Sequence, residues 1–276
     1  MTIDLRTSTD FEVLRAAKVL AKINEAAREA QVEYLVVGAT ARSLISIDLL
    51  GTSHQRRTDD IDIAAEVDSW NDYDSLVSTL KRHDGSVHKF IVEGTEVDVV
   101  PYGGIEQANR TITWPDDHVM NVLGFREAVD SAQTVLLPDG VSVKVPSIPA
   151  LVLLKLFAWQ DRHHEDTRDA LDLGPMIEWY SDPSGRYFER IFDVDAHVPE
   201  EFEFDPPPAG AWLLGKLIPG LLDEEGAAQL LLLLDDQDLM GQLSRDIGGA
   251  RPELLVRALS QGVRDAADEA NRSQPR

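Results

Sequence analysis

The sequence contains no cysteine and no long hydrophobic run. Without cysteine, the chain has no disulfide framework, no Cys-ligated zinc or iron–sulfur site and no thiol nucleophile. Its longest apolar stretch, residues 230–234, is far shorter than the roughly 20 residues of a membrane-spanning helix. The first residues do not have the pattern of a signal peptide. We therefore expect a soluble cytoplasmic protein with no membrane partner.

Basic residues are also scarce. Against 49 Asp and Glu there are 26 Lys and Arg, which gives a formal net charge of −23. Both halves of the chain are acidic, and no basic tail offsets them. Non-specific binding of nucleic acid depends on Lys and Arg, so we expect no DNA partner. Any contact with nucleic acid must be confined to a local basic pocket.

The 276 residues, 43% of them hydrophobic, suffice for two compact domains and exclude a mostly disordered chain. In the first half, apolar spacing predicts helices over residues 9–30, 39–50 and 70–82. Short apolar or alternating runs predict strands at 34–38, 60–64, 87–92 and 96–100, and a hairpin over 134–145.

After Pro146 helical spacing dominates, and helices are expected at 149–163, 166–180, 210–221, 225–234, 236–246 and 252–270. The run Pro206-Pro207-Pro208 predicts a break between two of them. The pattern as a whole predicts an α/β (α+β) domain with a mixed β-sheet over residues 1–146 and a mainly helical domain over 147–276.

Three aspartates occupy alternating positions of two predicted strands. Because side chains alternate between the faces of a strand, Asp60 and Asp62 point the same way while Ile61 and Ile63 point into the core. Asp98 alternates with valines in the same manner. If the two strands are neighbours, three carboxylates converge. They repel one another unless a cation lies among them, and Mg²⁺ suits such hard oxygen ligands.

A glycine precedes the predicted helix at 39–50, and the free N–H groups of a helix start can hold phosphate oxygens. Two metal ions held by carboxylates can stabilise the attacking and leaving oxygens of a nucleotidyl transfer. An Asp-x-Asp pair alone also occurs on solvated strands of acidic proteins. Combined with the strand–glycine–helix segment and Asp98, it indicates a functional site.

The segment Gly38-Ala39-Thr40-Ala41-Arg42, followed by Thr58-Asp59-Asp60-Ile61-Asp62-Ile63, resembles the signature of the nucleotidyltransferase (polymerase β-like) superfamily. Within it, the chain is similar to the AbiEii/AbiGii and MenT group of nucleotidyltransferase toxins. The resemblance implies that superfamily's sheet with flanking helices, and it assigns Asp60, Asp62 and Asp98 as catalytic metal ligands. Position 39 is Ala where the family often has Gly or Ser, so Thr40 is expected to offer its hydroxyl to the phosphates instead.

The resemblance continues from Leu154 to Leu173, which is similar to that group's Lys…Arg…(Lys/Arg)-Asp-x-x-Asp segment. It implies that Lys155 and Asp169 are catalytic and that Lys155, Arg162 and Arg168 bind the triphosphate. Residues 147–180 would then complete the active-site cleft. The alternative is a helical segment whose charges form ion pairs with one another, which is common.

The resemblance implies an enzyme that uses Mg²⁺, or Mn²⁺, to transfer NMP from an NTP to an acceptor hydroxyl, with release of pyrophosphate. The residues expected to line the nucleotide are Gly38, Ala39, Thr40, Arg42 and Arg57, although Arg42 is also suited to an ion pair within the fold. The toxin group implies RNA, such as a tRNA end, as acceptor, and a cognate antitoxin as partner. Two alternatives stay open: transfer to an aminoglycoside-like cation, and a module that binds a nucleotide or partner without turnover.

Overall fold

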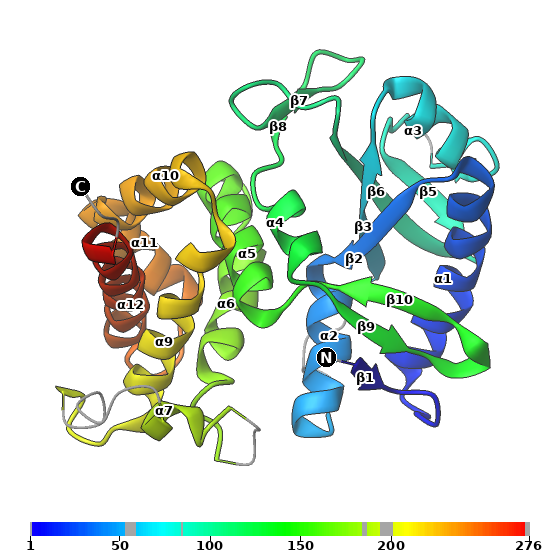
Figure 1. Cartoon of the computed structure of the whole chain (residues 1–276). Coiled ribbons are helices and arrows are strands. Elements are labelled where there is room, and N and C mark those ends of the chain that lie inside the picture. Colours follow the sequence, from blue (N-terminus) through cyan, green and yellow to red (C-terminus); the bar gives the residue numbers. More distant parts are fainter. Residues whose placement is uncertain (1, 53–58, 84, 184–186, 194–200, 274–276) are drawn as a thin grey trace. The chain divides into compact units, whose positions relative to one another are not determined.

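The computed structural model describes residues 2–52, 59–83, 85–183, 187–193 and 201–273 (Figure 1). Contacts within the chain divide it into two compact units, Met1–Ser147 and Ile148–Arg276. We call them the α/β unit and the helical unit. No helix in the described part of the chain is both long and apolar enough to cross a membrane.

The α/β unit is built on a mixed five-stranded sheet, as predicted. The strand order is β2-β3-β6-β5-β4. Only β3 and β6, which lie side by side in Figure 1, run parallel, and the other neighbours are antiparallel. The strands are β2 (Glu33–Val37), β3 (Asp60–Val67), β4 (Lys81–Arg82), β5 (Lys89–Val92) and β6 (Thr95–Gly103).

Alternation along β3 and β6 separates a core face from a polar face. Ile61, Ile63 and Val97 have no exposed surface, whereas the aspartates between them are half-buried. This is the alternation predicted from the sequence. The turn between β5 and β6, Glu93-Gly94, has φ angles of 52° and 80°. Two consecutive left-handed residues are typical of the tight turns that match the twist of a hairpin.

Three helices accompany this sheet: α1 (Phe11–Ala30), α2 (Gly38–Leu50) and α3 (Trp70–Val77). Helix α1 begins at Asp10, whose side chain accepts a hydrogen bond from the Glu12 N–H at 2.8 Å. Both α2 and α3 contact β3. The helix expected to reach residue 82 ends at Val77, because residues 81–82 pair with β5 as an edge strand. Sheet pairing there overrides the local helical pattern.

A second sheet has the order β1-β9-β10, with β1 (Thr2–Asp4) parallel to β9 (Gln133–Leu136) and β10 (Ser142–Val145) antiparallel to it. The β9–β10 hairpin was predicted, but β1 was not. A small hairpin of β7 (Thr111–Thr113) and β8 (Val119–Asn121) and the short helix α4 (Phe125–Asp130) also escaped prediction. Elements of three to six residues are too short for periodicity to reveal them.

The helical unit contains α5 (Ile148–Arg162), α6 (Arg168–Glu178), α7 (Arg190–Asp193), α9 (Pro206–Leu217), α10 (Glu224–Asp235), α11 (Gln237–Ile247) and α12 (Pro252–Ser273). The prolines expected to break the chain instead begin α9, where the first-turn N–H groups have no intrahelical partner. Helices α9 and α12 pack closely at Gly215 and Gly262. A Cβ at either glycine would lie about 2 Å from a backbone oxygen of the other helix.

Candidate functional site

Carboxylates from two neighbouring strands converge on the polar face of the α/β unit. Asp60, Glu96 and Asp98 each bring one carboxylate oxygen within 4.8 Å of the other two, and we call these three residues the carboxylate cluster. The parallel register places Asp60 opposite Glu96 and Asp62 opposite Asp98. Glu96 was not predicted, although its position two residues before Asp98 on an alternating strand could have revealed it.

The donor set of this cluster fits a hard divalent cation. The Oδ1 atom of Asp98 is buried and has no hydrogen-bond partner among the described residues. Burial raises the pKa of Asp98, and the neighbouring Lys89 offsets part of this effect. A buried anionic oxygen without a partner is costly, and a cation would remove that cost. Carboxylate oxygens grouped in this way suit Mg²⁺ or Mn²⁺.

Gly38 leaves room for the side chain of Asp62. The glycine has a φ of +62°, and a Cβ built on it would lie 2.0 Å from Oδ2 of Asp62. The Asp62 carboxylate therefore lies against Gly38, the first residue of α2. Any residue with a Cβ at position 38 would overlap this carboxylate. Asp62 is not part of the carboxylate cluster, and its role as a metal ligand stays a prediction.

Three residues that were expected to line the nucleotide are buried. Thr40 is 4% exposed, and its Oγ1 donates a hydrogen bond to the backbone oxygen of Asp60 at 3.3 Å. This hydrogen bond links the first turn of α2 to β3, and contact of the hydroxyl with a phosphate stays a prediction. Ala39 is also buried, and Arg42 has no exposed surface, which agrees with the ion-pairing alternative considered for it. Arg57 lies outside the described residues.

Lys89, on β5, provides a cation at the carboxylate cluster. Its Nζ contacts Oε1 of Glu96, and it lies 3.3 Å from Oδ2 of Asp98. Burial tends to lower the pKa of Lys89, but the two carboxylates outweigh burial and raise it. Lys89 was not identified from the sequence. The signal was available, because the hairpin register of β5 and β6 places it opposite Asp98.

The Lys and Asp residues of the second motif come together in the helical unit. Lys155 Nζ lies 2.8 Å from Asp169 Oδ1 and 2.9 Å from Asp172 Oδ2, and Arg162 Nε donates to Asp169 Oδ2 at 2.6 Å. We call these four residues the helical ion-pair cluster. Lys155 is 8% exposed and both aspartates are 1% exposed, whereas the Arg162 side chain is 55% exposed.

The electrostatics of the helical ion-pair cluster are those of a balanced buried network. Burial alone would lower the pKa of Lys155, but the carboxylates of Asp169 and Asp172 raise it. For Asp169, burial acts to raise the pKa, but Lys155 and Arg162 together lower it. Arg168, expected to bind phosphate, donates to Asp166 at 2.6 Å. The structure therefore shows the ion-pairing alternative at this segment, and phosphate binding by these residues stays a prediction.

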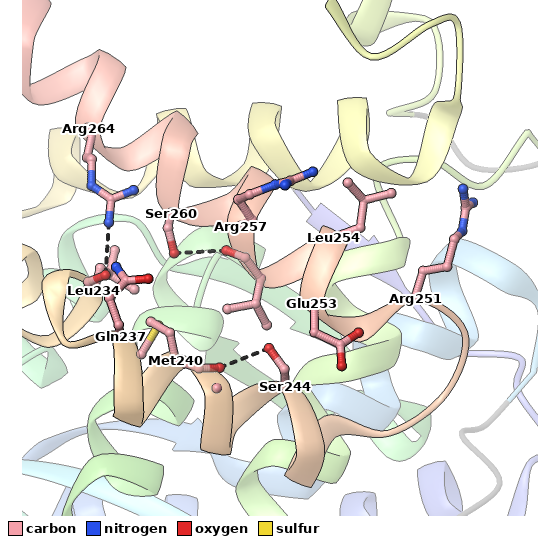
Figure 2. Close-up of a pocket in the computed structure, with 12 residues that line it drawn as sticks. Leu234, Gln237, Met240, Ser244, Arg251, Glu253, Leu254, Arg257, Ser260 and Arg264 are labelled. Carbon is pink, nitrogen blue, oxygen red and sulfur yellow. Dashed lines mark hydrogen bonds between the residues drawn. The ribbon is translucent and has the colours of Figure 1, made fainter.

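A cavity of about 540 Å³ lies beside α11 and α12 in the helical unit (Figure 2). The hydroxyls in its lining are engaged: Ser244 donates to the Met240 backbone oxygen and Ser260 to that of Val256. One carboxylate, Glu253, lines it, together with Arg251, Arg257 and Arg264. The described residues of its lining include no group of acids that could bind a metal ion, so this lining does not offer the chemistry of the carboxylate cluster.

Comparison with protein families gives a match over residues 10–267 to the family described as "Nucleotidyl transferase AbiEii toxin, Type IV TA system". Among curated protein sequences, none matches the chain.

Several solved structures are similar to the chain. The antibiotic-resistance factor ANT(2'')-Ia in solution is 14% identical, with 69% of this chain and 98% of that chain covered and a TM-score of 0.39. An antigenic nucleotidyltransferase-like protein from Paracoccidioides brasiliensis is 16% identical, with 72% and 94% covered and a TM-score of 0.40. The Thermotoga maritima CCA-adding enzyme complexed with tRNA is 14% identical, with 95% and 82% covered and a TM-score of 0.25.

Proposed function

We propose, from the premise that the chain belongs to the AbiEii nucleotidyl transferase toxin family, that this nucleotidyltransferase uses Mg²⁺ to transfer NMP from an NTP to a hydroxyl of RNA. A tRNA end is the acceptor that we favour. In the reaction, the hydroxyl oxygen bonds to the α-phosphorus, the bond from that phosphorus to the oxygen bridging to the β-phosphate breaks, and pyrophosphate leaves.

The observation that carries this proposal is the carboxylate cluster with its unpartnered buried oxygen at Asp98. Asp60, Asp98 and the additional Glu96 would hold the divalent ion, with Asp62 beside them at the start of α2. When bound, such an ion neutralises charge on the phosphates and polarises the reacting oxygens. Asp98 would also help to activate the acceptor hydroxyl by accepting its proton.

The start of α2 would hold the phosphates. Gly38 lies at the N-terminus of a 13-residue helix, where backbone N–H groups lack intrahelical partners and the helix dipole favours an anion. Because Gly38 also touches Asp62, phosphate and metal would meet at one place. Thr40 contributes indirectly, through its hydrogen bond to the Asp60 backbone.

An RNA acceptor is supported by membership of a toxin family, because a toxin that transfers nucleotides needs an essential cellular acceptor. The net charge of −23 argues for a small, focused contact rather than a broad basic groove. We also propose a cognate antitoxin as the physiological partner. The helical ion-pair cluster would support the reaction by fixing α5 against α6, with Lys155 and Asp169 proposed to act near the reactants.

The test is a transfer assay with each of the four α-labelled NTPs, Mg²⁺ and total tRNA, followed by separation of RNA from free nucleotide. We expect label in RNA with at least one NTP, and none when EDTA replaces Mg²⁺. A parallel arm offers an aminoglycoside, since an acidic face also suits a cationic acceptor. Label on the aminoglycoside but not on RNA would replace the proposed acceptor. Nucleotide binding without transfer to either acceptor would indicate a non-catalytic module.

A further inference from the structure

Among the described residues, a lysine of the same sheet already contacts the carboxylate cluster. Lys89 lies opposite Asp98 in the antiparallel pairing of β5 with β6, on the same face as the carboxylates. Its Nζ reaches Glu96 Oε1 and Asp98 Oδ2 at once. Glu96 and Asp98 are two of the three residues whose carboxylates could bind a divalent ion. The ammonium and an incoming metal ion therefore compete for the same two carboxylates.

The surroundings of Lys89 favour an ion pair that can open over a permanent one. The Lys89 side chain is 33% exposed, so a path to solvent is open, while Asp98 is 18% exposed. The four-carbon stem of lysine is flexible, and its ammonium is a compact charge that can turn between nearby anions. A divalent ion placed among the carboxylates repels the ammonium, and the phosphates of a nucleotide bound at the same face attract it.

We propose that Lys89 is an exchange residue that couples metal binding to nucleotide binding at this site. In the metal-free protein its ammonium bridges Glu96 and Asp98 and holds both carboxylates in place. When the divalent ion and the NTP bind together, the ammonium leaves the carboxylates and pairs with the phosphates. The metal alone binds weakly because it must displace Lys89 into water. This inference rests on the proposed function, since it assumes that the cluster serves an NTP and a divalent ion.

The experiment measures binding without turnover. Mn²⁺ is titrated into the full-length wild-type protein and into Lys89→Met, followed by electron paramagnetic resonance of free Mn²⁺, with and without an α,β-methylene NTP analogue. We expect Lys89→Met to bind Mn²⁺ alone about tenfold more tightly, because one positive charge beside the ion is gone. We expect Lys89→Met to bind the NTP analogue more weakly than wild type does. The factor by which the analogue increases the affinity for Mn²⁺ should therefore be smaller in Lys89→Met.

Lys81→Met is the matched control. Lys81 lies on the neighbouring edge strand opposite Ile91, is exposed, and makes no ion pair with any described residue. Its replacement should leave both dissociation constants unchanged. A melting curve adds a second measurement: Lys89→Met should melt lower than wild type in EDTA and gain more from added Mg²⁺.

The outcomes separate this inference from the proposed function. If wild type binds Mn²⁺, Asp98→Asn does not, and Lys89→Met binds like wild type, the metal site stands and the exchange is wrong. A loss of stability in Lys89→Met that Mg²⁺ does not reverse, with unchanged Mn²⁺ affinity, would show an ordinary cross-strand ion pair and also overturn the exchange. If neither wild type nor Lys89→Met binds Mn²⁺ with or without the analogue, both the exchange and the proposed metal site fail.

Discussion

The carboxylate cluster of the α/β unit and the helical ion-pair cluster both combine acidic and basic side chains, but they differ in the ratio of acids to bases and in burial. In the helical unit, two acids face two bases, Lys155 and Arg162, and the acids are almost completely buried. In the α/β unit, Lys89 contacts two of the three acids, Glu96 and Asp98, and all three acids remain partly exposed.

The difference distinguishes a partly exposed group of neighbouring acids from a buried network in which acids and bases are equal in number. Neighbouring carboxylates that are accessible gain free energy when a cation binds among them, because their mutual repulsion is relieved. A compensated buried network gains nothing from another ion and loses much when one partner is removed. Substitutions in the carboxylate cluster should therefore mainly reduce activity. Substitutions in the helical ion-pair cluster should mainly reduce stability.

The largest effect is expected for Asp60→Asn and Asp62→Asn. Each should reduce transfer about a thousandfold or more, because metal-ion catalysis contributes several kcal/mol to transition-state stabilisation. The fold should stay intact, with little change in the melting temperature in EDTA, because Asn has nearly the size and shape of Asp and both positions are half-buried. A transfer assay with labelled NTP measures the loss of activity, and calorimetric melting checks that the fold is intact. Near-wild-type transfer by both variants would place the metal site elsewhere.

Lys155→Ala should act on stability. Removing the lysine leaves Asp169 and Asp172 buried without their shared partner, at a cost of about 3–5 kcal/mol in the free energy of unfolding. Urea unfolding measures it. Arg162→Ala is the control, because the exposed Arg162 side chain should cost only about 0–1 kcal/mol. An unchanged unfolding free energy for Lys155→Ala, together with weaker NTP binding, would instead favour the phosphate contact implied by the family motif.

Gly38→Ala tests the contact between α2 and the carboxylates. The new Cβ would overlap Oδ2 of Asp62, so transfer should fall nearly as far as in Asp62→Asn. Stability should fall by about 1–2 kcal/mol, because a non-glycine residue is strained in the left-handed region. Gly51→Ala at the other end of α2 has a φ of +71° and no atom within 4 Å of its Cβ. Gly51→Ala should lose about as much stability as Gly38→Ala but keep full activity. If Gly51→Ala loses as much activity as Gly38→Ala, the overlap with Asp62 is not the cause.

The pH dependence of stability should follow the helical ion-pair cluster. The pKa of Asp169 is lowered by folding, so its contribution is present above its unfolded pKa and is lost as the pH falls through the folded value. The pKa of Lys155 is raised, so its contribution is present below about pH 10 and is lost as the pH rises through the folded value. Urea unfolding of wild type should show both declines, and the double variant Lys155→Met Asp169→Asn should show shallower ones. Equal declines in both proteins would exclude this cluster as the cause.

The smallest effect concerns salt. With few basic residues, we expect roughly two to four phosphate contacts, and each contributes about −0.7 to the log–log slope of affinity against salt on single-stranded RNA. Reversing Arg56 and Arg57, which lie outside the described residues, to Glu should weaken RNA modification. Arg257→Glu at the cavity of Figure 2 is the reversal in the helical unit that matches Arg57→Glu alone. If Arg257→Glu has the larger effect, the RNA contact lies in the helical unit.

Most of the long helices and strands were predictable from the sequence, because their hydrophobic residues recur with a clear period. The alternation around Asp60 and Asp98 predicted both strands and the shared face of their aspartates, and the register confirmed that they are neighbours. Short elements such as β1 and β4 escaped, since their pairing is decided by distant partners.

The site was predictable in its acids but not in its cation. Asp60 and Asp98 stood out because the motif marks them. Glu96 could have been found from the alternation along β6, whereas Lys89 required the register of the β5–β6 hairpin. Thr40 and Arg42 show the opposite limit. Their place in a motif suggested contact with the nucleotide, but only packing reveals that both side chains are buried.

The central claim is that the polar face of β3 and β6 performs divalent-dependent nucleotidyl transfer. The most direct measurement compares Mg²⁺-dependent labelling of RNA by wild type, Asp60→Asn and Glu66→Gln. Glu66 is an exposed acid on the same face of β3, six residues after Asp60 and outside the carboxylate cluster. The account predicts labelling by wild type and Glu66→Gln, abolished by EDTA, and none by folded Asp60→Asn. Labelling by Asp60→Asn at the wild-type rate would contradict it.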